Sequence, residues 1–271
     1  MSLFLKLFNT TAEYNAYTAD TANFIKPNVS LCEDTKDVYY NPEHDYSKDY
    51  FTMVVTTGGD IKWSGSTAAN TLSYSKNNGT TWTTADSGTA ISVAAGDKVL
   101  WKGTPTPQSS NGIGKFSGDT DARYSVEGNA MSLLFGDDFK TQTSLEGKNY
   151  ALYGLFSGCK GVTNAENLSL PATTLAQSCY GDMFDGCTSL MTAPELPATT
   201  LEKTCYLSMF NNCTSLSSIK CLATNISAKS CTTNWVNRVA ASGTFTKAAS
   251  MTSWTTGIDG IPSGWTVQDA A

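Results

Sequence analysis

MFDGCTSL at residues 183–190 and MFNNCTSL at residues 209–216 are two copies of one pattern, placed 26 residues apart. Phe156 and Cys159 provide a shorter match to the same Phe-x-x-Cys spacing. The string LPATTL also occurs twice, at residues 170–175 and 196–201, again with a step of 26 residues. A fixed period of about 20–29 residues is typical of leucine-rich-repeat-type solenoids. The repetition therefore predicts a stack of similar coils in the C-terminal part of the chain.

Stacking places equivalent residues of successive coils above one another. Phe184 is then expected over Phe210 and Cys187 over Cys213, while a further series contains Cys179, Cys205 and Cys231 in steps of 26 residues. Disulfides and a zinc site are the alternatives to buried thiols. The coils contain no C-x-x-C pair and no nearby histidine, and parallel side chains suit disulfide geometry poorly. We expect buried, reduced cysteines that hold no metal and no cofactor.

Each coil is expected to contain a short helical turn, as at residues 205–210, and a short strand, as at residues 216–219. The third unit is degenerate, because Trp235-Val236 stands where Met209-Phe210 stood. Terminal repeats are often atypical because they close the stack. Residues 243–265 are therefore predicted to form a terminal cap.

The Phe-x-x-Cys-x-x-Leu units resemble the BspA-like leucine-rich repeats of surface proteins from gut and oral bacteria. The resemblance covers about three units. It implies a binding scaffold without identifying the ligand, which we expect to be a host-surface or mucus glycan or protein.

Residues 49–145 show the pattern of an antiparallel β-sandwich. Short β-rich stretches recur at strand spacing, separated by Gly and Asn turns, and Asn77-Asn78-Gly79 is a hairpin signal. The stretch SKNNGTTW at 75–82 resembles the Asp-box hairpin of sialidases and other β proteins, with Asn77 in place of the Asp. We expect this hairpin to be structural, with the Asn77 side chain binding the amides of its own turn.

Residues 1–48 contain few apolar groups and two X-Pro steps, which favour an extended path. We expect an arm that folds on a partner or on sister subunits, with an ordinary strand packed on the next domain as the alternative. The residues expected to bind the partner are Leu3, Phe4, Leu5, Leu7, Phe8, Phe24, Ile25, Pro27, Asn28, Val29, Tyr39 and Tyr40.

The predicted fold is thus mainly β with short helices, in three parts. They are an N-terminal extended attachment arm (1–48), an antiparallel β-sandwich (49–145), and a leucine-rich-repeat-like solenoid with a terminal cap (146–271).

PNVS at residues 27–30, followed by VYYNP at residues 38–42, resembles a segment of virion proteins from crAss-like phages of gut Bacteroidetes. There it opens head-fibre and related fibre proteins. The resemblance implies a structural protein of the virion, assembled in the cytoplasm of the host bacterium and located on the capsid surface. It also implies a homotrimer that binds a capsid or other virion protein through residues 1–48. Such a protein needs no signal peptide, and the first eight residues do not suggest one.

Composition argues against several other classes of function. The net charge is −6 and there is no basic patch, which disfavours nucleic-acid binding. No apolar run reaches the length of about 18 residues that a membrane span needs. Paired carboxylates occur in Asp119-Thr120-Asp121 and Gly136-Asp137-Asp138, but neither stretch matches an EF-hand loop.

The sequence contains one histidine, His44, flanked by Glu43 and Asp45 in a polar stretch without a nearby nucleophile. A glycosidase would need two carboxylates in a cleft, and nothing favours a pair such as Asp137 with Glu166. We therefore expect no enzymatic activity. The alternatives to a head fibre are a tail fibre that binds a host receptor, a bacterial BspA-like surface adhesin, and a carbohydrate-active enzyme.

Overall fold

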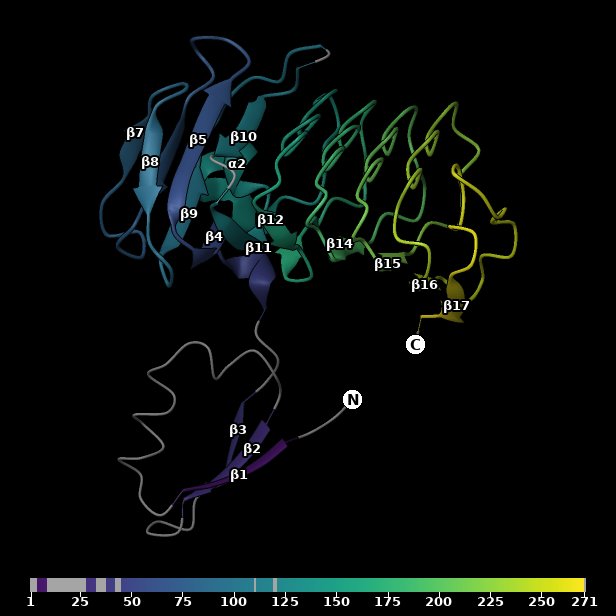
Figure 1. Ribbon diagram of the computed structural model, residues 1–271, viewed down its shortest axis with the longest axis horizontal. Coiled ribbons are helices and arrows are strands. Elements are labelled where there is room, and N and C mark those ends of the chain that lie inside the picture. Colours follow the sequence, from purple (N-terminus) through teal and green to yellow (C-terminus); the bar gives the residue numbers. More distant parts are fainter. Residues whose placement is uncertain are drawn as a thin grey trace. The chain divides into compact units, whose positions relative to one another are not determined.

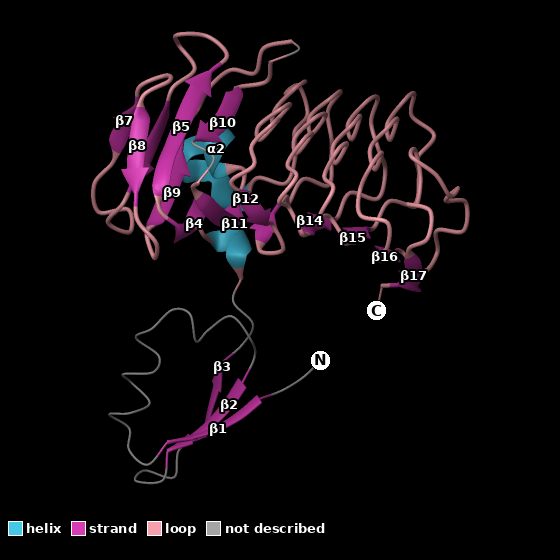
Figure 2. Cartoon of the chain, in the orientation of Figure 1, coloured by secondary structure: helices cyan, strands magenta, loops and turns pink. Residues whose placement is uncertain are grey.

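The computed structural model describes residues 4–8, 28–32, 38–41, 45–109, 111–118 and 121–270. The chain divides into two compact units, residues 1–45 and residues 46–271. Among the described residues, the smaller unit consists mainly of strands, and strands and loops predominate in the larger unit (Figure 2). The described helical elements are α2 (Ser132–Phe135) and the 3-10 helices η2 (Tyr46–Lys48) and η3 (Gly136–Thr141). The prediction of a mainly β protein is confirmed.

The smaller unit contains a three-stranded sheet of β1 (Phe4–Phe8), β2 (Asn28–Cys32) and β3 (Val38–Asn41). β2 is the central strand, parallel to β1 and antiparallel to β3. This arrangement differs from the extended path that we predicted for the arm. Pairing between the strands satisfies backbone N–H and C=O groups that an extended chain would leave to water.

The first part of the larger unit consists of two sheets and their connections (Figure 1). One sheet has the strand order β12-β11-β4-β9-β6-β7, with β13 also paired to β11, and the other has the order β10-β5-β8. The strands are β4 (Phe51–Thr57), β5 (Gly59–Gly65), β6 (Leu72–Ser75), β7 (Thr83–Ala85), β8 (Ala90–Val93), β9 (Lys98–Lys102), β10 (Gly114–Gly118), β11 (Arg123–Asn129), β12 (Val162–Asn164) and β13 (Leu168–Ser169).

Aromatic side chains from both sheets meet around Phe116 of β10. Its ring centroid lies 4.9 Å from that of Trp63 on β5 and 4.8 Å from that of Trp101 on β9. The ring of Phe51 on β4 lies 5.8 Å away, and all four side chains are fully buried. Large aromatic residues contribute much of the burial energy of a core, so this cluster binds the two sheets together.

The C-terminal part is a β-solenoid of about three turns, as the repetition predicts. Each coil contributes one strand to a parallel sheet, which lies along one side of the stack (Figure 1). Its strands are β14 (Thr192–Leu196), β15 (Ser218–Cys221), β16 (Thr244–Lys247) and β17 (Thr266–Asp269). Ile219 pairs with Phe245, and Phe245 with Val267, so equivalent positions of successive coils stay in register.

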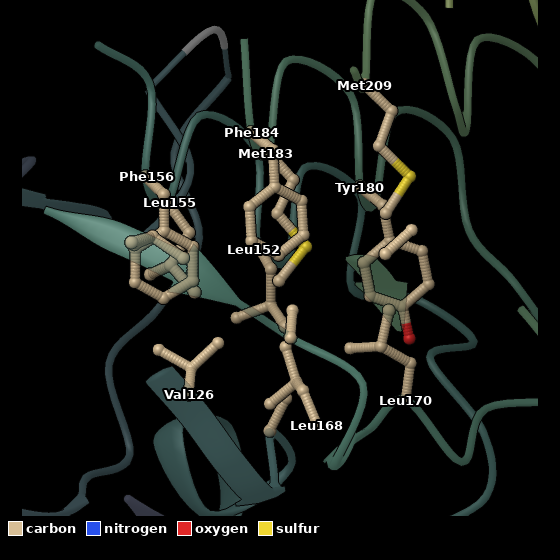
Figure 3. Close-up of a cluster of buried hydrophobic side chains, with 14 of the residues drawn as sticks. Val126, Leu152, Leu155, Phe156, Leu168, Leu170, Tyr180, Met183, Phe184 and Met209 are labelled. Atoms are coloured by element: carbon tan, nitrogen blue, oxygen red, sulfur yellow. The ribbon is translucent and has the colours of Figure 1, made fainter. Parts of the chain in front are cut away.

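Phenylalanine rings form a continuous stack through the core. Phe116 lies 5.6 Å from Phe156, Phe156 lies 5.2 Å from Phe184, and Phe184 lies 5.7 Å from Phe210. Figure 3 shows Phe156 and Phe184 side by side, with Val126 and Leu168 among the surrounding apolar residues. The predicted stacking of Phe184 over Phe210 is confirmed, and the stack extends into the sheets through Phe116.

Opposite the strands, each coil is a run of hydrogen-bonded turns. Alternate amides donate to the next coil: the N–H of Tyr180 to Cys205 O (3.1 Å), that of Asp182 to Leu207 O (2.8 Å) and that of Phe184 to Met209 O (2.9 Å). The amides between them donate within the coil, as from Met183 N to Tyr180 O (3.2 Å). Every backbone N–H in this run therefore has a partner without an α-helix.

Every fourth residue of this layer has a positive φ. Ser178, Asp182 and Gly186 have φ values of 54°, 51° and 72°, and the next coil repeats the pattern at Thr204, Ser208 and Asn212. A positive φ at the third position is a feature of type II turns. The predicted helical turn over residues 205–210 is therefore wrong, because the left-handed residues stop the backbone from continuing as a helix and turn alternate amides towards the next coil.

The stack continues past the degenerate third unit. Trp235 stacks on Tyr206 at 6.2 Å and on Trp254 at 5.4 Å, so one large ring extends the aromatic column where the Phe-x-x-Cys pattern is lost. The stretch CLATNI at residues 221–226 occupies the position of LPATTL, with Thr200 bridged to Asn225. β16 and β17 then add two more strands to the parallel sheet.

The described cysteines of the coils are all free and buried, as we predicted. Two of them link neighbouring coils through their thiols. Cys187 Sγ donates to Phe156 O at 3.1 Å, and Cys213 Sγ donates to Phe184 O at 3.0 Å. Burial raises the pKa of Cys179 to about 12, which keeps that thiol protonated. The stacked cysteines thus act as small apolar side chains that also form weak hydrogen bonds between coils.

Candidate functional site

The residues predicted to bind a partner fall in two groups. Phe4, Leu5, Leu7 and Phe8 lie in β1, Asn28 and Val29 in β2, and Tyr39 and Tyr40 in β3. Backbone pairing places Leu5 beside Val29, and Val29 beside Tyr40. Leu3, Phe24, Ile25 and Pro27 lie outside the described residues, as do His44, Asp119 and Thr120.

A polar groove of about 390 Å³ lies where the β10-β5-β8 sheet meets the first two coils. Its walls come from β5, β10, the loop before β10, and the turn layers of the coils. Side chains that line it are Ser64, Ser66, Asn111, Lys115, Tyr153, Ser157 and Asp182. The volume is within the range of roughly 300–1,000 Å³ that small-molecule sites occupy. A second depression of about 380 Å³, beside residues 104–107 and 147–150, has no comparable hydrogen-bonded acid.

Glycines allow the walls of the groove to approach one another. A Cβ on Gly112 would lie 2.6 Å from Tyr153 O, so only glycine lets this loop rest on the first coil. The edge of β10 is also joined to that coil, because Phe116 N donates to Leu155 O at 2.8 Å. The two walls of the groove are therefore held rigidly together within one compact unit.

Tyr153 and Asp182 are the central pair of the groove. The Tyr153 hydroxyl donates a short hydrogen bond to Asp182 Oδ2. The Tyr153 ring rests on Gly181, where a Cβ would lie 2.9 Å from ring carbons Cδ2 and Cε2. The equivalent residue in the next coil is Leu207, so glycine replaces a larger residue at the point where the tyrosine needs space.

The electrostatics of this pair favour a protonated tyrosine and a carboxylate acceptor. Burial, followed by the hydrogen bond to Asp182, raises the pKa of Tyr153 above its usual range. The pKa of Asp182 is also raised, chiefly by burial, although hydrogen bonds from Tyr153 and Ser208 oppose the shift. The tyrosine stays a donor, and the half-buried acid is held in place by two hydroxyl groups.

Apart from Ser66, whose hydroxyl donates to Gly112 O at 2.9 Å, the remaining polar side chains of the groove are available to a ligand. Lys115 is exposed on β10 opposite Ser64 in the strand register. Within the described part of the chain, no hydrogen bond or ion pair occupies the side chains of Ser64, Asn111, Lys115 or Ser157. The groove thus offers unoccupied donors and acceptors around one aromatic ring.

Beyond the groove, polar side chains form a ladder along the outer face of the coils. Asn211 Nδ2 donates to Asp185 Oδ1 at 2.8 Å, and Asn237 Nδ2 donates to Asn211 Oδ1 at 3.0 Å. These side chains satisfy one another, so the ladder joins the coils and leaves fewer open hydrogen-bonding positions than the groove.

The Asn77 hairpin is held by its own side chains, as we expected. Asn77 Oδ1 accepts from Thr81 N at 3.0 Å, and Ser75 Oγ accepts from Gly79 N at 2.9 Å. Trp82 at its end packs against Tyr50, and the Lys102 ammonium lies 4.3 Å from the centroid of the Trp82 ring.

Asp137, one of the carboxylates singled out in the sequence, belongs to this aromatic cluster. Lys102 Nζ donates to it at 2.8 Å and Tyr50 OH at 2.5 Å. The Lys102 hydrogen bond, followed by that from Tyr50, lowers the pKa of Asp137. The Asp137 carboxylate is thus already engaged in hydrogen bonds that stabilise the fold. No group of three or more potential His, Cys, Asp or Glu metal ligands occurs in the described ranges.

No helix in the described ranges is both long enough and apolar enough to cross a bilayer. No family model, curated protein or solved structure matches the chain.

Sequence reasoning did not identify the groove. Ser64, Lys115, Tyr153 and Asp182 come from four separate stretches that only the folded chain brings together. The signal that could have indicated it is the change from Leu207-Ser208 to Gly181-Asp182 between otherwise similar coils.

Proposed function

We propose that this chain is a non-enzymatic binding protein of the fibre type, which attaches through its N-terminal unit and displays a binding groove on its larger unit. The observation that supports this proposal is the composition of the groove. Its acid and its tyrosine are hydrogen-bonded to each other, and its open groups are hydroxyl, amide and ammonium groups suited to recognition. The separation of residues 1–45 from the rest suits a division between attachment and display.

The specific role that we propose is a head fibre on the capsid surface of a crAss-like phage, assembled in the host cytoplasm as a homotrimer. The two stretches that carry the resemblance, around Val29 and Tyr40, are neighbouring strands, with Val29 paired to Tyr40. A sheet edge in this unit offers backbone groups to a strand of a capsid protein or a sister subunit. Closed symmetry would present three grooves together and increase the avidity for a repeated ligand.

For the architecture, we propose that the two sheets of the larger unit are a β-sandwich, that the coils are leucine-rich-repeat-like, and that the C-terminal stretch from residue 243 onward caps the stack. The shared aromatic cluster around Phe116 supports the sandwich. The exposure of all four residues of β17 supports the cap, since a terminal coil has a solvent-facing side.

The experiment compares the full-length chain with a chain that begins at Tyr46, the first residue of the larger unit. Light scattering gives the mass of each, and co-sedimentation with purified capsids and with purified tails gives attachment. We expect a trimer that sediments with capsids for the full-length chain, and loss of sedimentation for the shortened chain. Sedimentation of the shortened chain would show that the N-terminal unit is not the anchor. Binding to tails alone would favour a tail fibre, and a monomer that binds neither particle would contradict a fibre role.

A further inference from the structure

We infer that the groove between β10 and the first two coils binds a sugar residue of a glycan, with Tyr153 and Asp182 as its main contacts. This inference rests on the proposal that the larger unit is a binding module, and it identifies the ligand class and the site.

The chemistry of the groove matches that of a pyranose. A sugar ring has a C–H face that packs on an aromatic ring, surrounded by hydroxyl groups that both donate and accept hydrogen bonds. Tyr153 provides the aromatic surface and Asp182 an ionisable acceptor. A carboxylate has about four lone-pair positions, so its bonds to Tyr153 and Ser208 leave acceptor capacity for a sugar hydroxyl.

The surrounding side chains supply both donors and acceptors of hydrogen bonds for a sugar. Lys115 offers three donors, while Ser64 and Asn111 can donate and accept. None of these three has a side-chain hydrogen bond or ion pair in the described part of the chain. A hydroxyl-rich ligand could satisfy them together, whereas an apolar ligand would leave them unpaired.

The site is also rigid before any ligand binds. The Tyr153 ring rests on Gly181, its hydroxyl is fixed by Asp182, and it makes a T-shaped contact with the Tyr150 ring, with centroids 5.7 Å apart. A preorganised aromatic ring loses little conformational entropy on binding, which favours affinity for a small ligand.

Two other ligand classes fit the groove less well. A phosphate would meet Lys115 as the one cationic side chain among the described residues that line the groove, and it would be repelled by Asp182. A peptide strand would need a free edge on β10, but the central residue of that edge, Phe116, already donates its N–H to Leu155.

The test uses the full-length protein and saturation-transfer NMR. The probes are methyl glycosides of neutral hexoses, deoxyhexoses and N-acetylhexosamines, together with an acidic sugar. We expect saturation transfer to at least one glycoside, with competition between glycosides that share a hydroxyl arrangement. Affinity is then measured by titration for the parent and for each variant.

Three variants change the groove in different ways. Tyr153→Ala removes the ring, Asp182→Asn keeps the shape but removes the charge, and Gly181→Ala displaces the ring without removing any polar group. Each should weaken sugar binding by about tenfold or more, the usual effect of losing one charge-assisted hydrogen bond or its geometry. Leu207→Ala and Lys203→Ala are the matched controls on the next coil and should bind as the parent does. A melting curve for each variant establishes that it is folded.

The absence of transfer to every glycoside would overturn the inference, as would undiminished binding by Tyr153→Ala and Asp182→Asn. Binding that is lost only in Trp82→Ala would place the sugar at the other aromatic cluster and would also overturn it. Attachment to capsids is a separate measurement. Capsid binding without sugar binding would refute this inference alone, and sugar binding without capsid binding would refute only the fibre role.

Discussion

The sheets of the larger unit and the coils that follow them bury aromatic cores in different ways. In the sheets, mostly antiparallel strands bring together residues that occur once, such as Trp63, Trp101 and Phe116. In the coils, the same kinds of residue recur every 26 positions and stack on their own copies, as Phe184 does on Phe210. Repetition therefore specifies packing along the stack, whereas the sheet core depends on contacts between unrelated stretches.

The two cores are continuous, because Phe116 of β10 lies against Phe156 of the first coil. The aromatic column thus begins in a sheet and ends at Trp254. We therefore expect the two regions to unfold together in one cooperative transition.

The largest expected effect is on stability, from Phe184→Ala. Phe184 is fully buried between Phe156 and Phe210, so its truncation should lower the free energy of unfolding by about 3–5 kcal/mol. Urea unfolding measures this change. Met191→Ala is the control, since Met191 is 52% exposed and should change stability by less than about 0.5 kcal/mol. Equal midpoints for the two variants would mean that the aromatic column does not stabilise the coils.

The second prediction concerns the thiols. The cysteines of the coils are buried, and burial raises the pKa of Cys179 to about 12, so they should react with a thiol reagent only when the chain unfolds. Thiol counting without reductant should give eight free cysteines in denaturant. In the native protein, the seven buried cysteines from Cys159 to Cys231 should not react. Three or four disulfides would contradict the stacked-thiol arrangement.

A smaller effect on stability should distinguish residues that have a positive φ in the turn layer from their neighbours. Ser230 has a φ of 55° and is exposed, whereas the neighbouring Lys229 is exposed without a positive φ. A left-handed L-residue costs about 1–2 kcal/mol, and a glycine costs about 0.5–1 kcal/mol in unfolded-state entropy. Ser230→Gly should therefore be about 1 kcal/mol more stable than Lys229→Gly in urea unfolding. The reverse order would mean that the turn layer lacks the left-handed residue.

The smallest expected effect concerns how stability depends on pH. The contributions of Asp182 and Asp137 should change in opposite directions as the pH falls. The pKa of Asp182 is raised by burial, so the native state takes up a proton more readily than the unfolded chain, and its contribution to stability rises as the pH falls towards about 4. The pKa of Asp137 is lowered by Lys102, so its contribution is lost as the pH falls below about 4.

The free energy of unfolding of Asp182→Asn, relative to that of the parent, should therefore be highest near neutral pH. For Asp137→Asn, the same difference should be lowest near neutral pH. Urea unfolding of both variants between about pH 3 and pH 7 measures these differences. Differences from the parent that change in the same direction with pH would contradict the assigned environments.

The sequence predicted what repetition and turn chemistry determine. The register of Phe184 with Phe210, the buried cysteine columns and the Asn77 hairpin follow from spacing and residue type alone. It did not predict the left-handed residues of the turn layer, because Ser, Thr and Asn at those positions have no strong local signal without a glycine. It also missed CLATNI as a third LPATTL position, since four of its six residues differ.

The groove was beyond prediction for another reason. Lys115 and Asp182 are far apart in the sequence, and their proximity depends on how β10 docks on the coils. No periodicity within either region contains that information.

The most direct test of the account is native-state hydrogen exchange over residues 46–270. The turn layer is assigned as a hydrogen-bonded ladder in one cooperative unit with the sheets, so the amides of Tyr180, Asp182 and Phe184 should exchange as slowly as those in the centres of β4 and β11. Their opening free energies should match the global free energy of unfolding. Rapid exchange of these amides, at the rate of exposed turns, would contradict both the ladder and the continuity of the core.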